Sequence, residues 1–400
     1  MIRRSVEAAL LRLWFDATPP WPLRLAGRAL APLSRLTARV ATRKRAQIAA
    51  LAPPPVPLVV VGNLLVGGVG KTPLVVAIVQ ALAARGWRPG LLASGHGARR
   101  RDARLVGADD DPAEHGDEAV LLARLAGRPL AAGRQRADAL ACLLAAHPEI
   151  DIVVSDDGLQ HAALPRSLEL AVFDARGAGN GRLLPAGPLR EPLAHLQQMD
   201  ALLVNGPATP PAAGPRLFRF EVVPGDFARV ARVARVARGT GQPAALIAES
   251  LSPEAFRCLV ATARPFPTAP DTPNAQDLPG AIAAVAGIGA PQRFFDTLTA
   301  LGLPPGQRLT PGDHRPLDAA TLAALDARFI VMTAKDAVKC EAWADDRCWA
   351  LHASARLDPA FVDWLDDSLR EGTRGSTPAR HPGLPDLQGP AEAGTPRQGR

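Results

Sequence analysis

Residues 62–73 read GNLLVGGVGKTP, between an apolar run ending at Val61 and an amphipathic run that begins at Leu74. This order predicts a strand, a glycine-rich loop and a helix, which is the arrangement of a P-loop. Glycines without a Cβ let backbone N–H groups turn toward phosphate oxygens at the positive end of the helix dipole. We therefore expect the nucleotide-binding residues to be Gly67, Gly68, Val69, Gly70, Lys71, Thr72 and Pro73.

The last residues of this loop indicate that the bound group is a nucleoside triphosphate with Mg²⁺. Lys71 is expected to reach the β- and γ-phosphates of a nucleoside triphosphate, and Thr72 to offer its hydroxyl to Mg²⁺. The strict P-loop pattern has glycine six residues before the lysine, where this chain has Leu65. A simple glycine-rich turn is the alternative, but the flanking strand and helix favour the P-loop.

Length and composition indicate a soluble protein of two domains. The chain has 400 residues, 47% of them hydrophobic, and a net charge of +7. No window of about 18 to 20 residues lacks charge, which argues against a membrane-spanning helix. The four cysteines show no CxxC or metal-ligand spacing, so reduced thiols and a cytosolic location are expected.

Residues 1–50 form a basic, amphipathic segment. Leu10, Leu13 and Trp14 share one helical face, and arginines recur at 35, 39 and 43. Such a segment suits an anionic membrane surface, but a helix packed on the domain with its charged face in water remains open. Nucleic acid is not an expected partner, because no aromatic platform or reading motif is present.

Beyond the hinge at residues 53–55, apolar runs alternate with helix-like stretches. This alternation predicts an α/β fold with a mainly parallel sheet. The strands expected in a P-loop domain at 51–205 are Val59–Val61, Gly90–Ala93, Ile152–Val154, Leu168–Phe173 and Ala201–Val204. A smaller α/β domain at 206–370 is expected to contain strands at Ala281–Gly287 and Phe329–Met332, and helices at Arg293–Leu301 and Phe361–Leu369. Residues 235–280 are predicted to be an irregular insertion and 371–400 a disordered tail.

Two carboxylates, Asp156 and Asp157, directly follow the apolar run that ends at Val154. In a P-loop fold this strand end lies beside the phosphates, where an aspartate can hold Mg²⁺ directly or through water. The alternative is that the pair only caps the next turn. Its place after a buried strand, downstream of a P-loop, favours a metal site.

A possible catalytic base for phosphoryl transfer consists of two residues, Asp117 and His314, that lie far apart in the sequence. Asp117 and Glu118 open an apolar helix, where a carboxylate is ordinarily a helix cap. His314 lies in a polar turn and, taken alone, is typical of an exposed loop. Together, Asp117 and His314 can serve as a base that takes the proton of an alcohol acceptor.

The remaining charges of interest are basic. Arg176, Arg182 and Arg190 lie among glycines and prolines in residues 174–192, where a stiff loop suits bidentate phosphate recognition, although solvated charge is the alternative. Only four of the 46 basic residues are lysines. Two of these, Lys335 and Lys339, lie in one short segment, either as functional groups or as solvated helix residues.

In ordered blocks over residues 50–205 and 281–340, the chain closely resembles the tetraacyldisaccharide 4′-kinases, the lipid A 4′-kinases of Gram-negative bacteria. The blocks are GNLLVGGVGKTP (62–73), HGDE (115–118), AGRQR (132–136), SDDGLQH (155–161), FDARGAGNGRLLPAGPLREP (173–192), AGIGAPQRFF (286–295), GDH (312–314) and MTAKDAVKC (332–340). The resemblance implies Mg²⁺-dependent transfer of the γ-phosphate of ATP to the 4′-hydroxyl of a tetraacylated disaccharide 1-phosphate, giving lipid IVA. It also implies a peripheral protein on the cytoplasmic face of the inner membrane.

The resemblance assigns roles to individual residues. It implies that Lys71 acts at the phosphates and that Asp117 is the catalytic base, assisted by His314 from across an interdomain cleft. Metal-binding roles are implied for Thr72, Glu118, Asp156 and Asp157.

Three departures from the family pattern stand out. The family usually has Arg and Tyr where this chain has Gly95 and His96, and Arg99 or Arg100 is the expected substitute. Ala290 and Ala334 stand where asparagine and glutamate are common.

Other nucleotide-dependent classes fit less well. Partitioning ATPases carry a second lysine where this chain has Val66, and the segment Thr333 to Asp336 has the wrong spacing for the base-reading motif of GTP switches. A purely structural membrane protein leaves Asp156 and Asp157 without a role.

Overall fold

In the computed structural model, the described residues are 2–211, 216–230, 250–262, 281–311 and 317–374. Their strands form one sheet in the order β11-β10-β12-β13-β8-β7-β6-β1-β5-β2-β4-β3, with β9 paired to β8. The strands are β1 Leu58–Gly62, β2 Pro89–Ala93, β3 Arg104–Leu105, β4 Leu130–Ala132, β5 Ile152–Asp156, β6 Leu168–Phe173, β7 Ala201–Asn205, β8 Arg216–Arg229, β9 Ser250–Leu251, β10 Ile282–Val285, β11 Gln307–Leu309, β12 Phe329–Thr333 and β13 Cys348–Leu357. The helices are α1 Ile2–Phe15, α2 Trp21–Ala49, α3 Lys71–Ala84, α4 Pro112–His115, α5 Asp117–Ala126, α6 Arg136–Ala146, the 3₁₀ helix η1 Leu193–Gln198, α7 Pro253–Thr262, α8 Pro291–Ala300, α9 Ala319–Ala323, α10 Ala334–Cys340 and α11 Pro359–Arg374.

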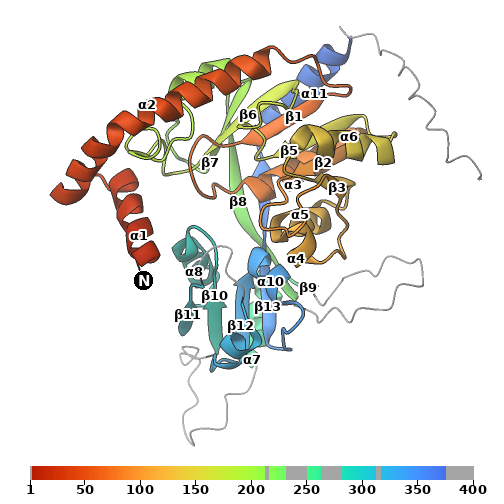
Figure 1. The fold of residues 1–400 in the computed structure, drawn as a ribbon. Helices are drawn as coiled ribbons and strands as arrows, with labels where there is room; N and C mark the ends of the chain where they lie inside the picture. The colour runs from red at the N-terminus through yellow and green to blue at the C-terminus, as the bar shows by residue number, and fades with distance from the viewer. Residues whose placement is uncertain (1, 212–215, 231–249, 263–280, 312–316, 375–400) are drawn as a thin grey trace, which may run out of the picture.

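The first half of the sheet is parallel from β8 through β4, with β1 near its centre (Figure 1). Val59 and Val61 face the core under α3 and α5, whereas Leu58 and Val60 face the core under α6. A strand buried on both faces is apolar at every position, which explains the continuous run before the P-loop. The expected α/β fold with a mainly parallel sheet is confirmed.

The second half repeats this layering on a smaller scale. Strands β11, β10, β12 and β13 are parallel to one another, with α7 and α8 on one face and α9 and α10 on the other. Residues 250–262 lie in the span predicted to be irregular, but they form β9 and α7. Phe256 of α7 is fully buried and stacks on Phe227 at 4.1 Å between ring centroids. The rest of that span, residues 235–249 and 263–280, lies outside the described residues.

The two halves are joined by the long strands β8 and β13. Residues 216–220 of β8 pair in parallel with β7, and residues 220–229 pair antiparallel with β13. The chain then returns to the first half, because Phe361, Leu365 and Leu369 of α11 are buried in the core beneath α3. The sequence placed this helix with the C-terminal domain, whereas its apolar face packs on the P-loop domain.

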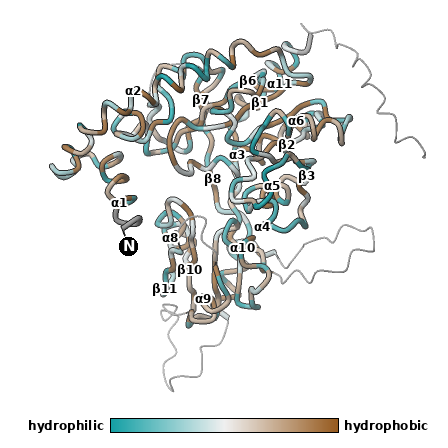
Figure 2. Tube along the Cα trace, viewed as in Figure 1, coloured by the Kyte–Doolittle hydropathy of each residue, from teal (hydrophilic) through white to brown (hydrophobic). Residues whose placement is uncertain are grey.

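Helices α1 and α2 lie along the edge of the first half and carry alternating hydrophobic and hydrophilic residues (Figures 1 and 2). Part of this segment is packed on the domain: Leu13 and Trp14 are buried, and Arg45 forms buried ion pairs with Glu169 and Glu191. Other apolar side chains of the two helices remain exposed, namely Val6, Leu11, Trp21, Leu25, Leu33, Leu36 and Val40. Among the described residues, no helix is long and apolar enough to cross a membrane.

If α7 is part of the second core, Phe256→Ala will lower the free energy of unfolding by about 3–5 kcal/mol, because it removes a buried ring and leaves a cavity. Arg257→Ala, at an exposed position of the same helix, will change it by less than about 0.5 kcal/mol. Denaturant unfolding of both variants measures the difference. Equal stability of the two variants would contradict the packing of α7.

Candidate functional site

The P-loop connects the carboxyl end of β1 to α3, which begins at Lys71. Gly67 and Gly70 have φ values of 97° and 85°, a region that residues with a Cβ rarely adopt. The Lys71 Nζ lies 2.8 Å from the Asn63 Oδ1 and 3.2 Å from the Asp157 Oδ1. Asn63 in turn donates to the Gly67 carbonyl at 3.1 Å. The lysine is thus held over the loop between a buried amide and a carboxylate.

Leu65, which departs from the P-loop pattern, has a structural role. It forms an isolated β-bridge with Leu189, and its side chain is fully buried. The bridge is extended by hydrogen bonds from the Val66 N–H to the Pro188 carbonyl at 3.0 Å and from the Arg190 N–H to the Leu64 carbonyl at 2.6 Å. A bulky residue at this position therefore anchors the arginine-rich loop against the P-loop.

Strand register places the acidic pair beside the P-loop. In the parallel pairing of β1 with β5, Val61 lies opposite Asp156, so both strands end at the same edge. Asp157 follows with a φ of 51°, and the Gly158 N–H bonds to the Val61 carbonyl at 3.3 Å. Asp157 contacts Lys71 and, through Oδ2, the Arg190 Nη1 at 3.3 Å. These contacts bring together the acidic pair and the lysine that the sequence predicted to act jointly.

The environment gives the two carboxylates different acidities. Burial raises the pKa of Asp156 to about 7, and the negative charges of Asp157 and Glu118 act in the same direction, opposed by Lys71. Burial also acts to raise the pKa of Asp157, but Lys71 and Arg190 outweigh it and hold that pKa below its usual range. Asp157 is therefore a stable anion, whereas Asp156 needs a further cation to stay ionised at neutral pH.

The acidic pair fits a magnesium ion. The Oδ1 of Asp156 is buried and has no hydrogen-bond partner within the described part of the chain. In that same part, no cluster of three or more acidic, histidine or cysteine side chains can hold a metal. Magnesium is usually held by one or two carboxylates with water and substrate phosphates completing its shell, so an isolated pair beside a P-loop suits it.

Asp117 and Glu118 begin α5 at the same edge of the sheet. Gly116, with a φ of 95°, sets the approach of this helix, because a Cβ there would lie 2.9 Å from the His96 carbonyl oxygen. Asp117 is 9% exposed, and its Oδ1 accepts the Glu118 N–H at 3.0 Å. His314, the predicted partner of Asp117, lies outside the described residues.

Two lysines from the second half reach these acids. Lys335 Nζ lies 2.8 Å from the Glu118 Oε1, and Lys339 Nζ lies 3.7 Å from the Asp117 Oδ2. Their side chains are only 15% and 9% exposed, so they are not solvated helix residues. Two signals in the sequence pointed to them: the scarcity of lysine and their place in the block MTAKDAVKC at 332–340.

The three predicted arginines differ in their surroundings. Arg176 pairs with Asp174 at 3.0 Å and donates to the Gly68 carbonyl at 2.6 Å, while Arg190 contacts Asp157 as described above. The Arg182 side chain is exposed. From the second half, Arg293 of α8 also reaches Asp174, at 2.8 Å. Two of the three arginines therefore border the P-loop.

The chain departs from the family pattern at Gly95 and His96, and the next residue, Gly97, lies near Asp117. A Cβ on Gly97 would be 3.8 Å from the Asp117 Oδ1. Arg99 and Arg100, the expected substitutes for the missing arginine, have exposed side chains that pair with Glu114 and Asp102, respectively. Ala290 is the N-cap of α8, and it offers no side-chain hydrogen bond to the helix.

Arg136 was not singled out by the sequence reasoning. Its side chain is 2% exposed and donates to the carbonyls of Ala93 and Asp156, the last residues of β2 and β5, and of Gly133, which directly follows β4. Burial lowers its pKa to about 10, which leaves it charged at neutral pH. It holds together the strand ends from which the acidic pair projects.

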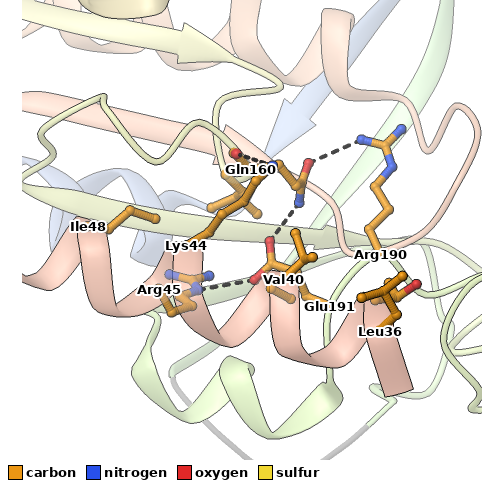
Figure 3. Close-up of a pocket in the computed structure, with 11 residues that line it drawn as sticks. Leu36, Val40, Lys44, Arg45, Ile48, Gln160, Arg190 and Glu191 are labelled. Atoms are coloured by element: carbon orange, nitrogen blue, oxygen red, sulfur yellow. Dashed lines mark hydrogen bonds and ion pairs between the residues drawn. The ribbon is translucent and has the colours of Figure 1, made fainter. Parts of the chain in front are cut away.

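A cavity of about 290 Å³ lies between α2 and the segments that contain Gln160 and Arg190 (Figure 3). Leu36, Val40 and Ile48 of α2 provide an apolar wall, and Arg190 lies on the opposite side. Gln160 joins the two sides, since its carbonyl oxygen accepts from Lys44 of α2 at 3.2 Å and its Oε1 accepts from Arg190 at 3.2 Å. The cavity thus combines an apolar wall with a cation that also contacts Asp157.

Known proteins share both the sequence and the fold. Residues 26–370 match the family model described as tetraacyldisaccharide-1-P 4′-kinase. The chain belongs to this family. It is 44% identical to a tetraacyldisaccharide 4′-kinase of Bordetella petrii, over 86% of this chain and 91% of the relative. It is 43% identical to one of Dechloromonas aromatica, over 90% and 97%.

A solved structure shows the same fold. The crystal structure of LpxK from Aquifex aeolicus in complex with ATP superposes with a TM-score of 0.66 at 22% identity, covering 86% of this chain and 99% of that one. The family model and the two relatives confirm the family resemblance, and this structure confirms the fold.

Substitution by alanine is expected to affect stability differently at two glycines of the P-loop. Gly70→Ala will destabilise the protein by at least about 1 kcal/mol, because its φ is positive and a Cβ would lie 2.9 Å from the Val222 Cγ2. Gly68→Ala will leave the free energy of unfolding nearly unchanged, since a Cβ there meets nothing within 4 Å. Chemical denaturation compares the two. A larger loss in Gly68→Ala would show that the loop adopts a different conformation.

Proposed function

We propose that this protein is an ATP-dependent kinase that transfers the γ-phosphate to the 4′-hydroxyl of tetraacyldisaccharide 1-phosphate, giving lipid IVA. Membership of the tetraacyldisaccharide-1-P 4′-kinase family carries this proposal. The site supports it, because a P-loop lysine, an acidic pair and a separate acid at α5 meet at one edge of the sheet.

The donor half of the site is the P-loop. Gly67 to Pro73 would surround the phosphates, with Lys71 turning from Asp157 toward the β- and γ-phosphates. Asp156 and Asp157 are the residues best placed to hold Mg²⁺ together with the Thr72 hydroxyl, and Glu118 would contribute to its surroundings. When bound, the ion neutralises charge on the phosphate oxygens.

The acceptor half requires a base. Asp117 would take the proton of the 4′-hydroxyl as its oxygen bonds to the γ-phosphorus, while the bond from that phosphorus to the bridging oxygen breaks and ADP leaves. We assign His314 to orient Asp117. The electropositive neighbours Lys335 and Lys339 keep the acids at the start of α5 in place.

The lipid is expected to approach from the side of α2. The cavity of Figure 3 has an apolar wall for an acyl chain, and Arg190 offers a cation for a phosphate. The exposed apolar residues of α2 lie at spacings of three, four and eight, so they share one face. Arginines 24, 28, 35, 39 and 43 flank this face and are exposed. We infer that it meets an anionic membrane surface, at the cytoplasmic side of the inner membrane.

Loss of the donor lysine or of the base will abolish lipid phosphorylation. Lys71→Ala and Asp117→Ala are each expected to lower kcat by at least about 100-fold without unfolding the protein. The assay incubates labelled ATP, Mg²⁺ and lipid A disaccharide 1-phosphate in detergent and detects the bisphosphorylated lipid by chromatography. Asp138→Ala, an exposed aspartate in the first turn of α6, is the matched control and retains activity. Near-wild-type activity of Asp117→Ala would remove the base assignment.

The membrane face can be tested separately. Deletion of residues 1–20 is expected to weaken sedimentation with anionic vesicles. A sharper variant, Leu25→Gln with Leu33→Gln, changes only exposed side chains and is expected to weaken it as well, because interfacial binding scales with buried apolar area. Leu105→Gln, at an exposed apolar position away from α2, is the control. Unchanged binding of the double variant would refute the surface assignment.

A further inference from the structure

The short helix α10 of the second half lies against the start of α5, and its two lysines face the acids there. Lys339 is the more buried of the two, with a side chain 9% exposed. Its Nζ lies between two carboxylates, 3.7 Å from the Asp117 Oδ2 and 3.4 Å from the Asp336 Oδ1. The proposed base therefore has a cationic neighbour that comes from the other half of the molecule.

Asp336 is held rigidly. It is fully buried, and its Oδ2 accepts the Gly287 N–H at 2.8 Å and the Thr333 hydroxyl at 2.6 Å. Thr333 ends β12, and Gly287 lies just beyond the end of the neighbouring strand β10. The position of Asp336 is thus set by two paired strands, and Lys339 follows it by about one helical turn. This arrangement fixes where the ammonium group can lie.

The type of cation also matters. A lysine is a compact point charge on a flexible stem, whereas the planar guanidinium of arginine demands a matching fork of acceptors. The chain uses arginine almost everywhere, yet it has lysine at 339. A single ammonium that lies between two carboxylates, one fully buried and the other nearly so, fits this site better than an arginine.

We propose that Lys339 is a positioning residue for the base Asp117, held by Asp336 so that the second half of the molecule completes the phosphoryl-transfer site. This inference rests on the proposed function. With Oδ1 of Asp117 bound to the Glu118 N–H and Oδ2 drawn toward Lys339, the carboxylate has one orientation relative to the P-loop. Loss of Lys339 removes this attraction at Oδ2 and lowers the rate of the chemical step while leaving nucleotide binding intact.

If Lys339 only held α10 against α5, loss of another contact between these two helices would lower kcat to the same extent. Two residues beyond Lys339, Glu341 also comes from the second half, and it pairs with Arg124 of α5 rather than with the residues around Asp117. Lys335 forms another tether, to Glu118. Docking of α10 on α5 therefore does not depend on Lys339 alone, and Glu341→Gln is a matched control that weakens the interface without touching the base.

The experiment measures kcat and KM for ATP in full-length wild type, Lys339→Met, Lys339→Arg and Glu341→Gln, with lipid A disaccharide 1-phosphate as acceptor. Lys339→Met is expected to lower kcat by about 100-fold with KM for ATP within about twofold, a loss at the lower end of what proton transfer contributes. Lys339→Arg, which keeps the charge, is expected to recover about tenfold of that loss, and Glu341→Gln to keep wild-type kcat.

Two results would overturn the inference: kcat of Lys339→Met within about threefold of wild type, or equal losses in Lys339→Met and Glu341→Gln. If Lys339→Met does not fold, as judged by thermal unfolding, Lys339→Gln is read by the same criteria. An inactive wild type that nevertheless binds ATP would instead contradict the proposed function.

Discussion

The parallel pairing of β1 with β5 is the constraint on which the site depends. It places Val61 opposite Asp156, so the P-loop and the acidic pair leave the sheet at the same edge. Both strands are buried on two faces, and a shift by one residue would turn every side chain to the opposite core. Hydrophobic burial therefore sets the geometry of the charged groups. Arg136 reinforces it by bonding to three strand ends.

Charge is arranged around that edge in alternating signs. Lys71 lies between Asn63 and Asp157, Arg190 contacts the other oxygen of Asp157, and Asp156 keeps a buried oxygen without a partner among the described residues. Because the pKa of Asp156 is raised by burial, the site as it stands favours an additional cation. The same edge is closed from the other half by Arg293 and the two lysines of α10. The second half thus supplies cations that pair with carboxylates of the first half.

Much of this arrangement was predictable from sequence, and the exceptions have physical causes. The strands of the first half were recognisable because each is an apolar run beside turn residues, whereas three-residue β4 is too short to show a pattern. Leu65 looked like a flaw in the P-loop because its partner Leu189 is 124 residues away. Helix α7 was hidden inside a span that contains proline-rich and repetitive residues. Helix α11 was recognised, but nothing local indicated that it packs on the first core.

Local sequence determined the loop at residues 62–73, the strands beside it and the types of residue at the site, because glycine conformations, hydrophobic periodicity and ordered motifs are properties of short segments. Tertiary structure decided which charges meet. Asp117 and Lys339 are far apart in the chain, and either could have been an ordinary helix residue in water. Their contact exists because β8 and β13 join two sheets into one and bring α10 against α5. Long-range pairing of this kind depends on the packing of whole layers, which no short segment encodes.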